Sequence, residues 1–205
     1  MSFTATYLEK ISASNAANGN YYGNSIAISA DGNTMAAAAS YVSGSSNQAN
    51  GAVRILTKSN NAWTQSASIV TPSNSNTDYF DYALAMSADG TTLVIGVMSA
   101  NGTASQQGQA LIYKLSGGTW SLFQTLTNTQ AGQDDNFGES VAISGDGSVV
   151  FIGATRGDIS AQNPNSGVAY AYVYNGSTYA STQMLSGAGT VTDCMFGASI
   201  ATSYD

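Results

Sequence analysis

Apolar and polar residues alternate along most of the chain, and short polar runs interrupt the alternation every few positions. A period of two is the spacing of a β-strand that buries one face. The Gly, Asn, Ser and Thr residues at the interruptions favour turns over continued strands. Helical spacing has almost no support. The pattern therefore predicts an all-β protein built from short strands.

One motif recurs three times at a nearly constant interval, which indicates an internal repeat of about 57 residues. It reads Ile-Ser-Ala-Asp-Gly at 28–32, Met-Ser-Ala-Asp-Gly at 86–90 and Ile-Ser-Gly-Asp-Gly at 143–147. An aromatic residue stands at a fixed distance before each of these Asp residues, and the same relation begins a fourth copy that ends at Asp205: the aromatic residues are Tyr22, Phe80, Phe137 and Phe196. The chain thus contains three full repeats and the start of another.

Each repeat contains four segments that read as strands, which we call A to D in chain order. Strand A runs from the aromatic residue to the Asp-Gly turn. Strand B is the apolar run after the turn, at 35–39, 93–97 and 149–154. Strand C starts at a glycine, at 51–56, 108–113 and 167–172, and strand D starts at Trp63, Trp120 and Tyr179. Because tight turns between strands demand a positive φ, we expect one at Gly32, Gly90 and Gly147.

Four-stranded units in tandem predict a β-propeller, in which each sheet packs face to face on its neighbours. A parallel β-helix is the competing architecture, but its coils are much shorter than these units. We expect four-stranded antiparallel blades of about 57 residues in a single propeller region, 1–205. The repeats run approximately over 20–77, 78–134 and 135–193, with a partial repeat at 194–205 that supplies a C-terminal strand A.

Residues 4–12 align with a strand D, which makes them the outer strand of an incomplete blade. A lone strand D followed by three blades and a lone strand A does not close a ring. We therefore expect the natural protein to continue past Asp205, to about six or seven blades. The alternatives are association between subunits and a small irregular fourth blade built from the two chain ends.

Composition excludes several function classes. The 205 residues include no His, one Cys and five Lys or Arg, with a net charge of −7. Catalytic triads and dyads that use His, and metal sites that need His or several Cys, are absent. Five scattered basic residues do not make a nucleic-acid surface, and no apolar run reaches the about 18 residues of a membrane span. We expect no cofactor, no nucleic-acid partner and no membrane insertion.

The segments Asn136–Ser144, Phe151–Ala154 and Gly167–Tyr170 resemble the FG-GAP repeats of integrin-α-like propellers. Phe196–Ala201 and Tyr22–Ala27 are similar, whereas the second repeat departs from the motif with Phe80-Asp81-Tyr82-Ala83. The resemblance implies a propeller fold and, in some repeats, a calcium loop of the form Asp-x-Asp-x-Asp-Gly. Ser and Ala stand here where that loop has its first two Asp residues, so we expect no metal at these turns.

The connections between strands B and C, at 41–50, 99–107 and 156–166, differ in sequence while the strands agree. Variable loops on a rigid scaffold are where recognition usually resides. Together with the neighbouring D–A loops they give a candidate binding surface that comprises Tyr41, Asp78, Asp81, Tyr82, Asp134, Asp135, Arg156 and Asp158. The acidic pairs in this set could serve a glycosidase that uses two carboxylates, or they could be turn formers of the repeat.

These features predict a non-enzymatic interaction or structural propeller of an extracellular or virion-surface assembly. Its role would be adhesion, or recognition of a receptor or glycan, as in a tail or capsid appendage of a phage or virus. We expect a protein or glycan surface as ligand, and contacts with other subunits or with further chain of the same assembly. A calcium-assisted integrin-like adhesion module and a carboxylate-based glycan hydrolase are the alternatives.

Overall fold

The computed structural model describes residue 11 and residues 22–39, 52–70, 82–100, 107–128, 134–159, 164–187 and 192–203. The regular elements in these ranges are all strands, as predicted: β1 (Tyr22–Ile28), β2 (Thr34–Ala39), β3 (Ala52–Ser59), β4 (Ala62–Val70), β5 (Tyr82–Met86), β6 (Thr92–Val97), β7 (Gln109–Ser116), β8 (Thr119–Leu126), β9 (Phe137–Ile143), β10 (Val149–Ala154), β11 (Val168–Tyr174) and β12 (Tyr179–Leu185). Within these ranges there is no helix with the length and apolar character to cross a membrane.

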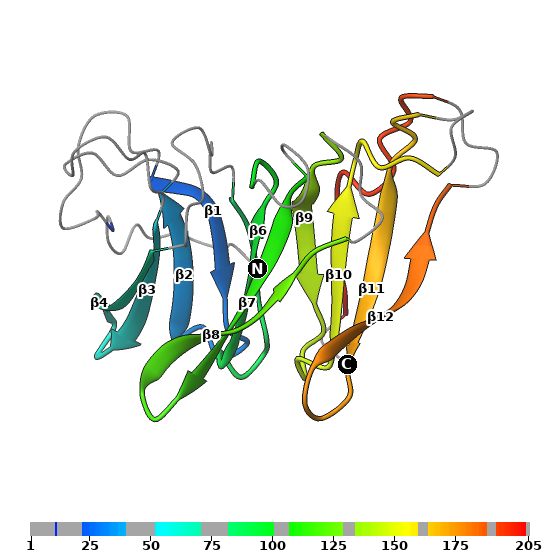
Figure 1. Ribbon diagram of the computed structural model, residues 1–205. Coiled ribbons are helices and arrows are strands. Elements are labelled where there is room, and N and C mark those ends of the chain that lie inside the picture. The colour runs from blue at the N-terminus through cyan, green and yellow to red at the C-terminus, as the bar shows by residue number, and fades with distance from the viewer. Residues whose placement is uncertain are drawn as a thin grey trace, which may run out of the picture.

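The strands form three four-stranded antiparallel sheets, each a simple meander of consecutive strands (Figure 1). We call them sheet 1 (β1–β4), sheet 2 (β5–β8) and sheet 3 (β9–β12). Each sheet corresponds to one sequence repeat, and its strands follow the predicted order A to D. The antiparallel pairing excludes the parallel β-helix as the arrangement of these residues.

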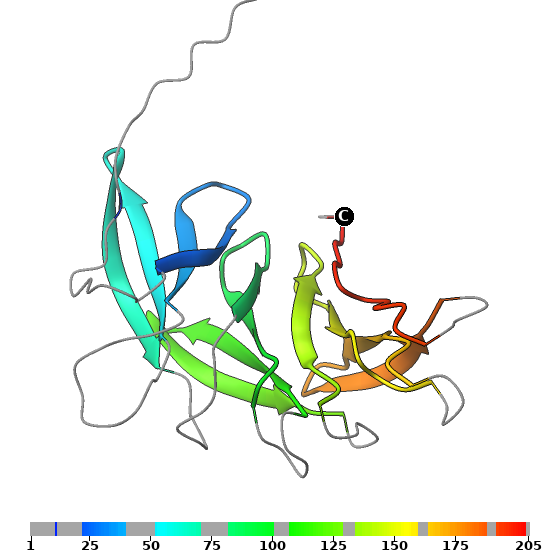
Figure 2. The same cartoon turned by 90° about the horizontal axis from the view of Figure 1, so that it is seen from above.

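The sheets stand side by side in an arc, with the first strand of each sheet on the inside and the fourth on the outside (Figure 2). The inner strands are neighbours, since β5 contacts both β1 and β9. This is the propeller-like arrangement that the repeat predicted. It brings the two faces of sheet 2 against sheets 1 and 3.

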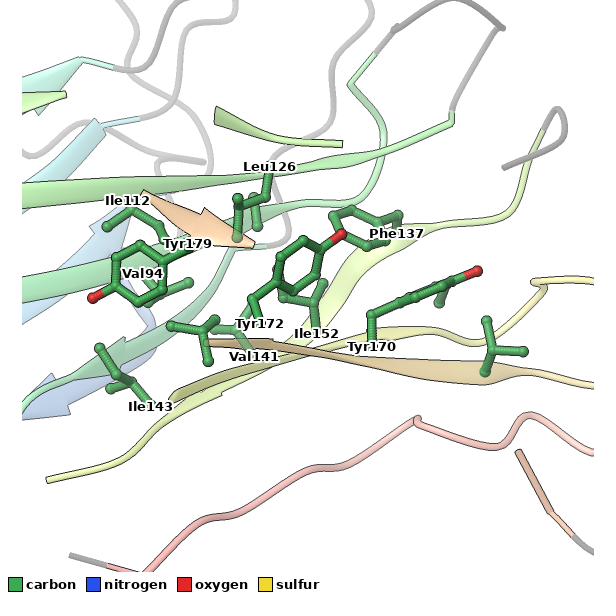
Figure 3. Close-up of a cluster of buried hydrophobic side chains, with 14 residues drawn as sticks. Val94, Ile112, Leu126, Phe137, Val141, Ile143, Ile152, Tyr170, Tyr172 and Tyr179 are labelled. Atoms are coloured by element: carbon green, nitrogen blue, oxygen red, sulfur yellow. The ribbon is translucent and has the colours of Figure 1, made fainter. Parts of the chain in front are cut away.

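A hydrophobic core fills each of the two spaces between sheets. Between sheets 2 and 3, Val141 and Ile143 of β9 belong to one cluster with Val94 and Ile112 of sheet 2 (Figure 3). Phe137 is fully buried in the same cluster, with its ring centroid 5.6 Å from that of Tyr170. Successive side chains point to opposite sides of a strand, so the strands of the middle sheet place apolar residues in both cores.

The Asp-Gly turns between the first two strands share one hydrogen-bond network. In sheet 2, the Ser87 hydroxyl donates to Asp89 Oδ1 (2.6 Å) and accepts from the Thr92 N–H (2.9 Å), while the Thr91 N–H donates to the same carboxylate oxygen (3.0 Å). The corresponding bonds recur around Asp31 and Asp146. The predicted positive φ is confirmed at Gly32 (69°), Gly90 (70°) and Gly147 (73°).

These turns also bond to one another across the sheets. The Ala30 N–H donates to the Ala88 carbonyl (2.9 Å), and the Ala88 N–H donates to the Gly145 carbonyl (2.8 Å). All three residues hold the position directly before the turn Asp. A main-chain relay therefore links the three sheets at the end where these turns lie.

The aromatic-glycine step that opens sheet 3 packs against the glycine before the third strand of sheet 2. Phe137 and Gly108 form a parallel bridge, and the Phe137 N–H donates to the Gln107 carbonyl (3.1 Å). A side chain on Gly108 would overlap the Phe137 main chain. Phe196 and Gly167 repeat this bridge one step further along the chain.

The two expected end strands differ in outcome. Residues 196–203 lie against sheet 3 through hydrogen bonds from Ser140 Oγ to the Gly197 carbonyl (2.6 Å), from Thr202 Oγ1 to the Ile143 carbonyl (2.7 Å) and from the Phe196 N–H to the Ser166 carbonyl (3.2 Å). They make a single bridge and no strand, so the predicted C-terminal strand A is wrong for these residues. A ladder needs a partner strand, and the described residues supply none on that side. The predicted strand at 4–12 falls outside the described residues, apart from Ile11.

Candidate functional site

The candidate binding surface lies at the end of the sheets opposite the Asp-Gly turns, because the B–C and D–A loops join strands at the other end of an antiparallel meander. We call this the loop end. Tyr41, Asp78 and Asp81 fall outside the described residues, and Tyr82 is the first residue of β5. The remaining four candidates, all described, come from two loops of sheet 3: Asp134, Asp135, Arg156 and Asp158.

The loop that enters β9 alternates residues of positive φ. Asp134 (64°), Asn136 (58°) and Gly138 (97°) all adopt the left-handed conformation. The same pattern recurs before residue 197, where Asp193 has a φ of 62° and Met195 one of 53°. Asp and Asn tolerate this conformation better than most residues. The recurrence supports the interpretation of these acidic residues as turn formers of the repeat.

Asp135, in the same loop, is buried. It lies near a series of hydrogen bonds that connects sheet 2 to sheet 3. The Gln107 side-chain amide donates to the Asn128 carbonyl (2.8 Å), and Asn128 Nδ2 donates to the Tyr170 hydroxyl (2.6 Å). Burial, followed by the negative charge of Asp135, raises the pKa of Tyr170 to about 12. Tyr170 therefore stays protonated near neutral pH and holds the two sheets together at the loop end.

Three further contacts stabilise the chain near these buried hydrogen bonds. The Arg156 N–H donates to the Asp135 carbonyl (3.3 Å), which connects the B–C loop to the D–A loop. Thr155 Oγ1 donates to Glu139 Oε2, and Asp158 Oδ1 accepts from the Asn165 N–H (2.8 Å). Arg156 and Asp158 are exposed, whereas Thr155 is buried. Arg156 thus presents a cationic side chain and Asp158 an anionic one, above a base of hydrogen-bonded residues.

The sequence did not single out the residues that build this base: Gln107, Asn128, Glu139, Thr155 and Tyr170. A signal existed for Gln107, which directly precedes the glycine of strand C, as Ser166 does in the next repeat. Their carbonyls accept the N–H of Phe137 and of Phe196, respectively. The main chain at that position therefore marks the junction between sheets, and the side chain of Gln107 adds its bond to the Asn128 carbonyl.

Metal ligands do not gather in the described part of the chain. In those ranges there is no group of three or more His, Cys, Asp or Glu residues placed to hold an ion. The turn carboxylates of Asp31 and Asp146 accept hydrogen bonds from Ser29 and Ser144, and these bonds lower the pKa of both Asp residues. Each turn thus uses its carboxylate to close its own loop.

The FG-GAP repeat family model matches residues 120–173, which run from Trp120 in β8 to Val173 in β11. This segment is an FG-GAP repeat, as its motif predicted. The sequence matches no curated protein.

Solved structures share the fold at low sequence identity. Sqt1 from Chaetomium thermophilum is 17% identical, with 84% of this chain and 37% of that chain covered at a TM-score of 0.52. The RRP9 WD40 repeats are 12% identical, with 86% and 42% covered at 0.51. The chain spans less than half the length of each of these structures.

Proposed function

We propose that this chain, which carries an FG-GAP repeat in a propeller-like arrangement of sheets, is a non-enzymatic interaction module. It belongs to an extracellular or virion-surface assembly, and it binds a protein or glycan surface through its loop end. Adhesion or receptor recognition would be its role. The similar structures support only the fold, because their sequence identity to this chain is low.

The contrast between the two ends of the sheets carries this proposal. At the turn end, the three Ser-x-Asp-Gly turns have the same hydrogen bonds and are linked to each other through their main chains. At the loop end, the connecting loops differ in sequence between repeats. A scaffold that is uniform at one end and variable at the other suits recognition at the variable end.

The chemistry of the loop end favours a polar ligand. Arg156 and Asp158 are exposed within one short segment after β10. Arg donates several hydrogen bonds in a fixed plane, and Asp accepts them. Sugar hydroxyls and the polar side chains of a protein surface can satisfy both groups together.

A charge reversal at Arg156 tests the proposal. The R156E variant, the K58E variant and the unmodified protein are compared for binding to a glycan array and to immobilised cell-surface proteins. K58E carries the same change of charge on β3, near the turn end. We expect R156E alone to lose binding. Equal binding by both variants, or hydrolysis of an arrayed glycan by the unmodified protein, would overturn the proposal.

A second contact surface supports the proposed assembly. Ile26 and Ile28 on β1 are 63% and 46% exposed, whereas Val141 and Ile143, at the same positions of β9, are 8% and 6% exposed. In sheet 3 these positions face sheet 2. We propose that another sheet, from a further chain segment or another subunit, covers the outer face of sheet 1 in the assembly.

The mass of the native particle tests this second surface. The I26S/I28S variant should lose assembly while it keeps the thermal stability of the isolated chain, because both side chains are exposed in that chain. Size-exclusion chromatography with light scattering gives the readout. A unit of 20.9 kDa for native protein and variant alike would contradict the proposed contact.

A further inference from the structure

The side chain of Gln124, in sheet 2, forms two hydrogen bonds with the main chain at the outer edge of sheet 3. Gln124 Nε2 donates to the Tyr179 carbonyl (2.9 Å), and the Tyr179 N–H donates to Gln124 Oε1 (2.8 Å). Tyr179 pairs with Tyr174, one step beyond the Asn175–Thr178 hydrogen bond of the β11–β12 turn. Ladder bonds alternate along an antiparallel pair, so the N–H and C=O of Tyr179 point away from β11. The Gln124 amide occupies that edge.

The edge of sheet 2 has the same geometry with a different neighbour. Trp120 pairs with Leu115, one step from the Ser116–Thr119 pair that closes the β7–β8 hairpin. Its N–H and C=O therefore point away from β7, as those of Tyr179 do from β11. In sheet 1, Ala67 faces Ile55 as Gln124 faces Ile112 in sheet 2. Ala67 thus holds in sheet 1 the position that Gln124 holds in sheet 2, but its side chain has no amide.

A groove lies where the missing amide would be. It has a volume of about 350 Å³ and lies between β4 and the β7–β8 hairpin; its lining residues are Ala67, Ser68, Ile69, Val70, Tyr113, Gly118, Thr119 and Trp120. Ala67 and Trp120 also pack against the core between sheets 1 and 2. The groove therefore joins an apolar floor to an outward main-chain donor and acceptor.

We propose that this groove binds the side-chain carboxamide of a glutamine or asparagine from a partner polypeptide. The partner's amide N–H₂ donates to the Trp120 carbonyl, and its oxygen accepts from the Trp120 N–H. This repeats the pair of bonds that Gln124 makes with Tyr179 within the chain. The groove is separate from the loop end, so the failure of either proposal leaves the other standing.

A primary carboxamide suits this edge because its donor and acceptor lie side by side in one plane. A trans peptide bond and an N-acetyl group place their N–H and C=O on opposite sides, so neither makes both bonds with one residue. Adjacent hydroxyls of a sugar could offer a donor and an acceptor. We favour the amide because the chain itself uses an amide for this contact at the next sheet.

The test uses the full chain and a seven-residue peptide with the sequence of residues 121–127, which carries Gln124. A matched peptide with Glu in place of Gln keeps the shape but lacks the donor. Binding is followed in ¹⁵N-labelled protein by NMR. We expect the Gln peptide to shift the Trp120 main-chain and indole signals, and the Glu peptide to bind about tenfold more weakly.

Two variants of the chain separate groove binding from other contacts. A67Q supplies the amide from within, so it should abolish peptide binding, whereas the A67S control should retain it. Q124A opens the equivalent groove at sheet 3 and should create a second site at Tyr179, which keeps the test independent of how A67Q folds. Unchanged binding by A67Q, or a Trp120 response to glucose or N-acetylglucosamine but not to the peptide, would overturn the proposal.

Discussion

The carbonyl oxygen of Gly138 occupies the space that a Cβ atom on Gly96 would need. Gly153 and the carbonyl of Gly197 repeat this relationship at the next junction. Glycine is thus required because two main chains meet there, and at Gly96 a turn plays no part. The corresponding pair at the junction of the first and second repeats is different. Ala38 of the first repeat holds the position of Gly96, and Asp81 of the second repeat holds the position of Gly138. The two positions of the motif therefore change together in this chain.

Replacement of Gly96 by alanine should separate sheets 2 and 3. We expect G96A to lower the free energy of unfolding by about 1–3 kcal/mol, since the added methyl group forces the main chains apart. Chemical denaturation measures the change. The control is G117N, at an open position where the β3–β4 hairpin of sheet 1 carries Asn60 with a positive φ of 52°. Equal stability of G96A and G117N would contradict the close contact.

The Ser-x-Asp-Gly turns should differ in how much each serine contributes. Ser87 is 1% exposed and bonds to both Asp89 and the Thr92 N–H, whereas Ser144 is only partly buried. We expect S87A to cost about 1–3 kcal/mol, because it leaves a buried N–H without its acceptor. S144A should cost less, since water can reach its turn. Thermal unfolding ranks the two, and the reverse order would count against this explanation.

Alkaline pH should unfold the protein through its buried tyrosines. Burial raises the pKa of Tyr170, Tyr172 and Tyr179 from 10.0 to about 12. The folded state therefore holds these protons after the unfolded chain has released them. Their contribution to stability is complete below pH 10 and is lost as the pH rises toward 12. Stability measured together with tyrosinate absorbance should fall within that window, and Y172F should make the fall shallower.

Calcium should leave the stability of the chain unchanged. Calcium takes about six to eight oxygen ligands, and each Ser-x-Asp-Gly turn offers one carboxylate that already accepts hydrogen bonds. Calorimetric scans in excess calcium and in a chelator should therefore superimpose. A melting temperature that rises with calcium would instead favour the integrin-like alternative.

The strands and the Asp-Gly turns could be predicted from the sequence because each depends on local chemistry that recurs three times. Strand C of the third repeat was expected at 167–172, and β11 spans Val168–Tyr174. The positive φ of Gly90 follows from the same local rule. Repetition gives each local signal three independent copies, which is why the sheet order was also predictable.

Contacts between sheets could not be predicted in the same way. Gln124 makes its two bonds to a residue that follows 55 positions later, and in sheet 1 an alanine holds its position. The hydrogen bond between Asn128 and Tyr170 likewise joins residues of two different repeats, 42 positions apart. Such pairings are set by the angle between sheets, and a single sequence does not encode that angle in any local pattern.

The relay from Ala30 through Ala88 to Gly145 has a consequence for how this protein can vary. It fixes the spacing of the three sheets at one end with main-chain atoms alone. Substitutions in the turn side chains therefore leave these main-chain hydrogen bonds in place. At the opposite end, the residues that join the sheets are Gln107, Asn128 and Tyr170, and the exposed parts of the loops lie outside this set. The exposed parts of those loops can be exchanged or lengthened while these bonds are kept, so new binding specificities can arise without redesign of the scaffold.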